Sequence, residues 1–158
     1  MPFNELTVEV NPGNNTIKGI SRISLPAGQS AKVYLTGIKV TTVSVGERPL
    51  AVEPGTESVT FTPGSAEDIL KIEYSAEYRP LPESNNYNNP GVIRGNHIGS
   101  EGILLADNWY PSVDGASLYR LTAVLPSQFE AISEADEVRV RPRADSSREF
   151  LFVFEHPL

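Results

Sequence analysis

Short segments in which apolar and polar residues alternate run through most of the chain. The clearest is Leu70–Tyr78, where Leu, Ile, Tyr, Ala and Tyr occupy every second position and charged residues or serine stand between them. Alternation with period 2 is typical of a β-strand that has one buried and one solvated face, as in antiparallel sheets. We therefore predict a strand here, and the same reasoning predicts strands at Leu6–Val10, Tyr119–Leu125 and Val138–Val140.

Two further strands are predicted to be irregular. The spacing of apolar residues in Ile17–Leu25 changes phase near Gly19-Ile20, which predicts a β-bulge in that strand. Between residues 38 and 45 the apolar residues switch from even to odd positions, so this strand should be bulged or bent. Shorter strands are expected around residues 33–35 and 59–61. One segment, 128–137, could be helical, but its apolar residues are too sparse for an amphipathic helix.

These elements predict an all-β fold, either an antiparallel β-sandwich or a strongly bent, saddle-like sheet. Thirteen prolines and twelve glycines separate the short apolar runs, as expected of strands joined by turns. The length fits a single β-domain over residues 1–158. Residues 80–102 interrupt the pattern with a segment rich in asparagine and proline, which we interpret as a long surface loop between two sheet blocks.

The last predicted strand, Phe150–Phe154, is apolar on both faces. Such a strand is normally covered on both sides. If the element that covers it is missing, the strand should form an exposed apolar patch and the chain should self-associate through Phe150–Phe154. The competing interpretation places this strand in the centre of the sheet and predicts a monomer.

Composition removes several classes of function. The chain has no cysteine, only two histidines, and a formal net charge of -7, so thiol chemistry is absent and nucleic-acid binding is disfavoured. No apolar run is long enough to be a membrane segment, which leaves a soluble domain as the expectation. The absence of cysteine fits the cytoplasm, but removal of a signal peptide would leave an extracytoplasmic location equally open, so the compartment stays undetermined.

The densest group of chemically interesting residues lies between Ile98 and Asp114. It contains the only tryptophan, Trp109, followed by Tyr110, together with the acids Glu101, Asp107 and Asp114. Aromatic rings beside carboxylates could receive an ammonium group through charge pairing and cation–π attraction. Alternatively, this is a loop whose two aromatic residues plug the edge of a sheet.

The order of these segments resembles the N-terminal β-domain of zinc aminopeptidases of the alanyl-aminopeptidase (gluzincin) type. The opening strand, its Asn-Pro turn and the following Thr-Ile-Lys-Gly resemble the first hairpin of that domain, and Leu70–Tyr74 resembles its L-x-I-x-Y strand. The segment Trp109-Tyr110-Pro111 with Asp114 resembles the family's Y/F-P-x-x-D motif, and the strand from Tyr119 to Pro126 resembles the strand that follows it.

The resemblance implies a truncated, non-catalytic domain that walls the active-site cleft of a larger protein and helps bind the amino terminus of a peptide substrate. The G-x-M-E-N and H-E-x-x-H motifs of the family are absent, so zinc is implied only in a missing catalytic domain, the natural partner of this one, and the chain alone should have neither cofactor nor peptidase activity. By counting back from Asp114, the residue that binds the amino terminus falls at Gly102 or, with a shift of one, at Glu101; Trp109 and Tyr110 would shape the cleft. The alternative is a free-standing β-sandwich that binds carbohydrate or a protein partner.

Overall fold

The computed structural model describes residues 1–82 and 95–158 and contains strands but no helix within these ranges. The all-β prediction is therefore confirmed. The strands are β1 (Phe3–Asn11), β2 (Thr16–Ser24), β3 (Ala31–Tyr34), β4 (Lys39–Val45), β5 (Arg48–Pro49), β6 (Ser58–Phe61), β7 (Leu70–Glu77), β8 (His97–Gly99), β9 (Gly102–Leu104), β10 (Ser112–Val113), β11 (Leu118–Pro126), β12 (Glu137–Pro142) and β13 (Ser147–Val153).

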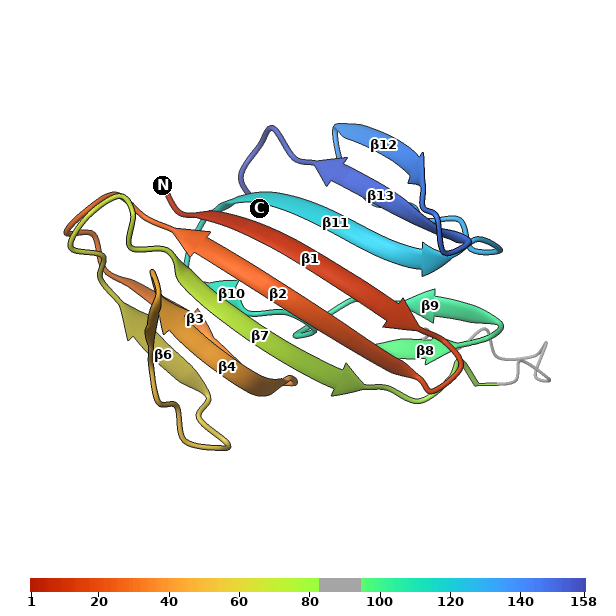
Figure 1. Cartoon of the computed structure of the whole chain (residues 1–158), viewed down its shortest axis with the longest axis horizontal. Helices are drawn as coiled ribbons and strands as arrows, with labels where there is room; N and C mark the ends of the chain where they lie inside the picture. Colours follow the sequence, from red (N-terminus) through yellow and green to blue (C-terminus); the bar gives the residue numbers. More distant parts are fainter. Residues whose placement is uncertain (83–94) are drawn as a thin grey trace, which may run out of the picture.

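Eight of the strands form one long sheet in the order β12-β13-β11-β1-β2-β7-β4-β5 (Figure 1). All neighbours in this sheet are antiparallel except β1 and β11, which run parallel from Phe3 beside Leu118 to Glu9 beside Val124. The sheet is thus mixed, whereas the alternation in the sequence predicted antiparallel pairing throughout. Alternation reports which face of a strand is buried and carries no information about the direction of its neighbour.

A second, divided layer covers one face of the long sheet. The three-stranded sheet β10-β3-β6 and the hairpin of β8 and β9 supply this layer. The core is correspondingly divided in two: Val33, Leu35 and Phe61 pack with residues of β2, β4 and β7, while Ile98 and Trp109 pack with residues of β1, β11 and β13. This arrangement is sandwich-like, as predicted.

Strand β2 alternates regularly between buried and more exposed positions, so the predicted bulge near Gly19-Ile20 is wrong. The buried positions between Ile17 and Ile23 are occupied by Gly19 and Ser21, which an apolar pattern cannot reveal. Gly19 lies opposite Tyr74 of β7, and a methyl group at Gly19 would be 2.2 Å from Cζ of Tyr74. The tyrosine ring therefore lies across the glycine and fills the space of its missing side chain.

The irregularity predicted for the strand at 38–45 is confirmed. The pairing of β4 with β7 shifts register between Val40 and Thr42, which is where the apolar residues change parity. Residues 128–137 form no helix, as their sparse apolar content indicated.

Regular structure appears inside the segment that was expected to be a loop. Of residues 80–102, the stretch 97–99 forms β8, and residue 102 begins β9. Residues 83–94 of the expected loop lie outside the described residues.

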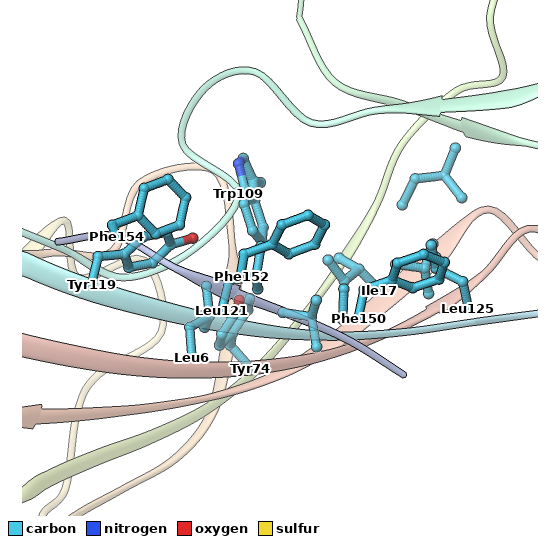
Figure 2. Packing of buried hydrophobic residues seen from close by; sticks show 14 residues of the cluster. Leu6, Ile17, Tyr74, Trp109, Tyr119, Leu121, Leu125, Phe150, Phe152 and Phe154 are labelled. Carbon is cyan, nitrogen blue, oxygen red and sulfur yellow. The ribbon is translucent and has the colours of Figure 1, made fainter. Parts of the chain in front are cut away.

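Strand β13 is internal to the sheet, with β11 on one side and β12 on the other. Phe150, Phe152 and Phe154 are 1%, 2% and 8% exposed and belong to the larger core cluster, which Figure 2 shows from close by. The predicted exposed patch at Phe150–Phe154 is therefore wrong, because β12 occupies the edge position and the second layer covers the phenylalanine face. The competing interpretation, a central strand, is the one that the structure has.

Candidate functional site

The hairpin of β8 and β9 presents Glu101 to solvent in its two-residue turn. Its first strand is fixed in the core by Ile98, which is fully buried. The carbonyl oxygen of Ile98 accepts a hydrogen bond of 2.5 Å from Nδ2 of Asn15, and its amide N–H donates to the carbonyl of Arg79 at 3.2 Å. The carboxylate of Glu101 is thus carried by a short element whose base is anchored on both sides.

Two glycines allow this hairpin to lie tightly against the chain segment that precedes it. A Cβ atom at Gly99 would be 2.9 Å from Cβ of Pro80, and one at Gly102 would be 2.9 Å from Cδ1 of Leu81. Both distances are shorter than ordinary van der Waals contacts. A side chain at Gly99 would meet the rigid ring and the backbone of Pro80 and would push the hairpin away, whereas one at Gly102 would meet only the end of the Leu81 side chain, which can turn aside. Close packing of the hairpin therefore requires glycine at Gly99 more than at Gly102.

Asn96 connects the base of the hairpin to the segment that leads to Trp109. Its Oδ1 accepts hydrogen bonds from the amides of Ala106, at 2.7 Å, and Asp107, at 3.1 Å, while its Nδ2 donates to the carbonyl of Asp107 at 2.5 Å. Sequence reasoning missed Asn96, which follows a segment crowded with asparagines and has no distinguishing neighbour.

Trp109 and Tyr110 begin a row of aromatic rings that crosses the core. Trp109 meets Tyr110 edge to face at 4.7 Å between centroids, Tyr110 stacks on Tyr119 at 5.4 Å, and Tyr119 lies 4.9 Å from Phe154. Trp109 is only 7% exposed, and Figure 2 shows it within the buried cluster that contains Tyr119 and Phe154. Trp109 therefore has a packing role, as the second interpretation of this segment expected, but it packs in the core and not at an edge of the sheet. Tyr110 remains partly exposed.

Asp114 lies apart from the hairpin, just after β10. It is exposed, and its amide donates to the carbonyl of Lys32 at 2.8 Å. Figure 1 shows β10 well separated from the tip of the β8–β9 hairpin along the long sheet. The five residues singled out in the sequence therefore form three groups: Glu101 with Gly102, Trp109 with Tyr110, and Asp114.

Burial raises the pKa values of four tyrosines around the aromatic row. The pKa is raised for Tyr74, Tyr110 and Tyr119 by loss of contact with water. The phenols of Tyr78 and Tyr110 raise the pKa of Tyr74 further, because each disfavours a second negative charge nearby. The phenols of Tyr110 and Tyr74 have the same effect on the pKa of Tyr119. Burial also raises the pKa of Tyr78, against the opposing effect of a hydrogen bond with Asn96. The hydroxyl of Tyr74 has no hydrogen-bond partner within the described part of the chain.

These shifts predict that the fold is lost at alkaline pH. An unfolded tyrosine has a pKa near 10, so above about pH 10 the folded chain holds more protons than the unfolded chain. The stabilisation is complete below this pH and is lost as the pH rises from about 10 towards the higher folded-state values. We expect urea midpoints to fall above about pH 10 and the phenolate absorbance of these tyrosines to rise only with unfolding. Full ionisation of all the tyrosines while the circular dichroism of the sheet persists would contradict this expectation.

Residues 1–82 and 95–158 bring together no group of three His, Cys, Asp or Glu side chains that could hold a metal ion. The described ranges likewise hold no helix that is long and apolar enough to cross a membrane. The hairpin offers a carboxylate for an ammonium group, and the described residues do not fit a zinc ion.

The fold is shared with a class of metallopeptidases. A substituted form of an M1 zinc metallopeptidase from Deinococcus radiodurans, bound to a Tyr-Ser-Ala substrate, is similar to 99% of this chain with a TM-score of 0.61 and 18% identity. A two-domain M1 zinc metallopeptidase bound to L-tryptophan gives 0.63 and 16%, and one bound to L-arginine gives 0.62 and 15%, each over 99% of this chain.

This chain spans only 39% of the length of each of those three proteins. At such identities the likeness shows a common fold. No protein-family model matches the sequence, and no curated protein matches it by sequence.

Proposed function

We propose that this chain is the non-catalytic N-terminal β-domain of a metalloaminopeptidase-like protein, where it walls one side of the active-site cleft and helps bind the substrate's amino terminus. The observation that carries the proposal is the match of nearly the whole chain to about two fifths of M1 zinc metallopeptidases. The remaining three fifths of such a protein would supply the zinc site and the chemistry, because the described residues contain no metal-binding group.

The chemistry of the hairpin supports the second half of the proposal. A peptide such as the tripeptide bound to the Deinococcus protein carries an α-ammonium group at neutral pH. The carboxylate of Glu101 is exposed at the end of a hairpin whose base is anchored, so it can pair with such a group at little cost in ordering.

The larger protein provides the decisive test. We expect the reading frame that encodes Leu158 to continue into a region containing H-E-x-x-H, and the corresponding protein to hydrolyse aminoacyl anilides. Activity should disappear with a strong chelator and return with zinc. A reading frame without such a region, or a purified protein that neither binds zinc nor cleaves these substrates, would leave the binding-module alternative.

The role of Glu101 is tested in that larger protein by Glu101→Gln. We expect KM for peptides with a free amino terminus to rise about fivefold, the equivalent of ~1 kcal/mol, which is the upper range for an exposed ion pair. Amino-terminally acetylated peptides should bind the variant and the parent protein equally.

The matched control is Glu47→Gln, which removes the same charge from an exposed turn between β4 and β5. It should leave KM unchanged. Equal KM values for Glu101→Gln and the parent protein would remove Glu101 from the site while leaving the domain assignment intact.

A further inference from the structure

Strand β12 is the long free edge of the eight-stranded sheet. Within residues 1–82 and 95–158 it pairs only with β13, and all six of its residues are exposed. The opposite edge is formed by β5, which has only two residues. Free edges expose unpaired backbone groups to which another strand can bond, so β12 is the position where the sheet can be extended.

The backbone groups of β12 that face outward belong to Val138, Val140 and Pro142, and the proline contributes only its carbonyl. The amide of Arg143 donates to the carbonyl of Ser147 at 3.0 Å, at the end of the β12–β13 ladder. Bonded pairs in an antiparallel ladder recur at every second residue, so Glu137, Arg139 and Arg141 direct their backbone groups toward β13. The N–H and C=O groups of Val138 and Val140 consequently point away from the sheet.

The side chains of these valines lie on the face that forms the core, opposite Phe152 and Phe150 of β13. They are nevertheless 46% and 51% exposed. The other face of β12 is charged: Arg139 pairs with Glu137 at 2.6 Å, whereas Arg141 has no ion-pair partner within residues 1–82 and 95–158. Glu149 lies opposite Arg141 in the ladder but forms its ion pair with Arg143. The free edge therefore combines outward-facing backbone groups, exposed apolar side chains and an arginine that makes no ion pair in the described part of the chain.

We propose that β12 pairs antiparallel with β12 of a second copy of this chain, so that one continuous sheet runs through a two-fold dimer. This proposal is independent of the peptidase assignment. In an antiparallel pair of identical strands, the numbers of the two residues that lie opposite each other always add up to the same sum. Residues that lie opposite each other share a face of the sheet, so both numbers are odd or both are even, and the sum is even.

Charge and hydrogen bonding select one register, that centred on Arg139. In this register Val138 of each copy lies opposite Val140 of the other copy. These two pairs form four backbone hydrogen bonds and bring exposed apolar side chains together. It also places Glu137 opposite the unpaired Arg141 of the second copy, at both ends of the interface. The two central Arg139 side chains oppose each other, but each is held by its own Glu137.

The neighbouring registers are worse. Centring the pair on Val140 places Arg139 opposite Arg141 and sets Pro142, which has no N–H, against Val138. Centring it on Val138 requires the amide of Asp136, which already donates to the carbonyl of Val153 at 3.0 Å. The arginines and the proline thus act against non-specific pairing of this edge and leave one favourable arrangement.

The test is a charge-exchange experiment with the 158-residue chain, read by sedimentation velocity and light scattering over a range of concentrations. We expect the unsubstituted chain to dimerise reversibly. Arg141→Glu and Glu137→Arg should each weaken dimerisation at least tenfold, because each puts like charges opposite each other twice. An equimolar mixture of the two variants should dimerise again, because the mixed pair restores two unlike contacts.

Lys18→Glu is the matched control, since it reverses an exposed charge on the internal strand β2; it should leave dimerisation as it is. Urea unfolding of each variant verifies that the sheet is intact. The proposal is overturned if the unsubstituted chain stays monomeric up to about 1 mM, the weak end of specific affinities. It is equally overturned if dimers form but neither substitution weakens them, or if the mixture of folded variants fails to associate.

Discussion

Replacing Gly19 with alanine is expected to lower the free energy of unfolding by about 3 kcal/mol, the upper range for overpacking a core. The added methyl group would lie 2.2 Å from Cζ and 2.4 Å from Cε1 of the Tyr74 ring, far inside van der Waals contact. The ring cannot move aside easily because Tyr74 is 2% exposed and belongs to the packed core cluster. Urea unfolding of the variant beside the parent chain measures the loss.

A double-mutant cycle makes this expectation specific to the pair. In a Tyr74→Ala background the space above Gly19 is empty, so Gly19→Ala should cost less than about 1 kcal/mol there and the coupling energy should exceed about 2 kcal/mol. Tyr74→Phe serves as a control: it keeps the ring and removes a hydroxyl that has no partner in the described structure, so stability should be unchanged or slightly higher. Additive effects of the two alanine substitutions would show that the close approach is not what constrains Gly19.

The second large effect is expected for Asn4→Ala. Asn4 is 2% exposed in β1, donates from Nδ2 to the carbonyl of Pro111 at 3.0 Å, and accepts at Oδ1 a hydrogen bond of 2.7 Å from Ser21. The substitution leaves both partners buried without a hydrogen bond, which costs about 1–3 kcal/mol for each group. We expect the free energy of unfolding to fall by about 3 kcal/mol.

Because Pro111 follows Trp109 and Tyr110 in the chain, this bond also fixes the end of the aromatic segment. The fluorescence of Trp109, the only tryptophan, should shift to longer wavelength in Asn4→Ala as the ring becomes more exposed. Ser21→Ala is the control: it removes one of the two bonds and leaves that to Pro111, so it should destabilise the chain less and leave the emission unchanged. If Asn4→Ala is as stable as the parent, the buried amide is replaceable and the aromatic segment is fixed by other contacts.

The sequence predicted strands well where burial is decided by a strand's own pattern. Strand β7 shows this, and so does the bulge in β4, where a change of parity marks the shift between Val40 and Thr42. Prediction failed at β2, because Gly19 and Ser21 occupy buried positions whose partners, Tyr74 and Asn4, come from other strands. No local pattern specifies those partners.

The sequence drew attention to the residues of the candidate site, whose role in binding stays a prediction, and it did not reveal how they are arranged. Local composition identified the segment around Trp109 and the turn that carries Glu101, and left open whether the aromatic residues bind a ligand or fill the core. Their placement depends on Asn15 and Asn96, whose side chains bond backbone groups distant in sequence. The position of Phe150–Phe154 in the sheet likewise depended on β12, whose own pattern does not reveal which strand it joins.

The parallel pairing of β1 with β11 has a consequence for how the chain acquires its structure. Phe3 and Leu118 lie side by side although 115 positions, 118 minus 3, separate them in the chain. During synthesis β1 can form its hairpin with β2 early, but its other edge stays open until β11 has left the ribosome, on the order of ten seconds later. Contacts of such long range also slow folding, since the intervening chain must be ordered before they form. The nascent domain therefore passes through a period in which β1, a central strand of the finished sheet, is an exposed edge. During this period the chain is most prone to aggregate and depends most on chaperones.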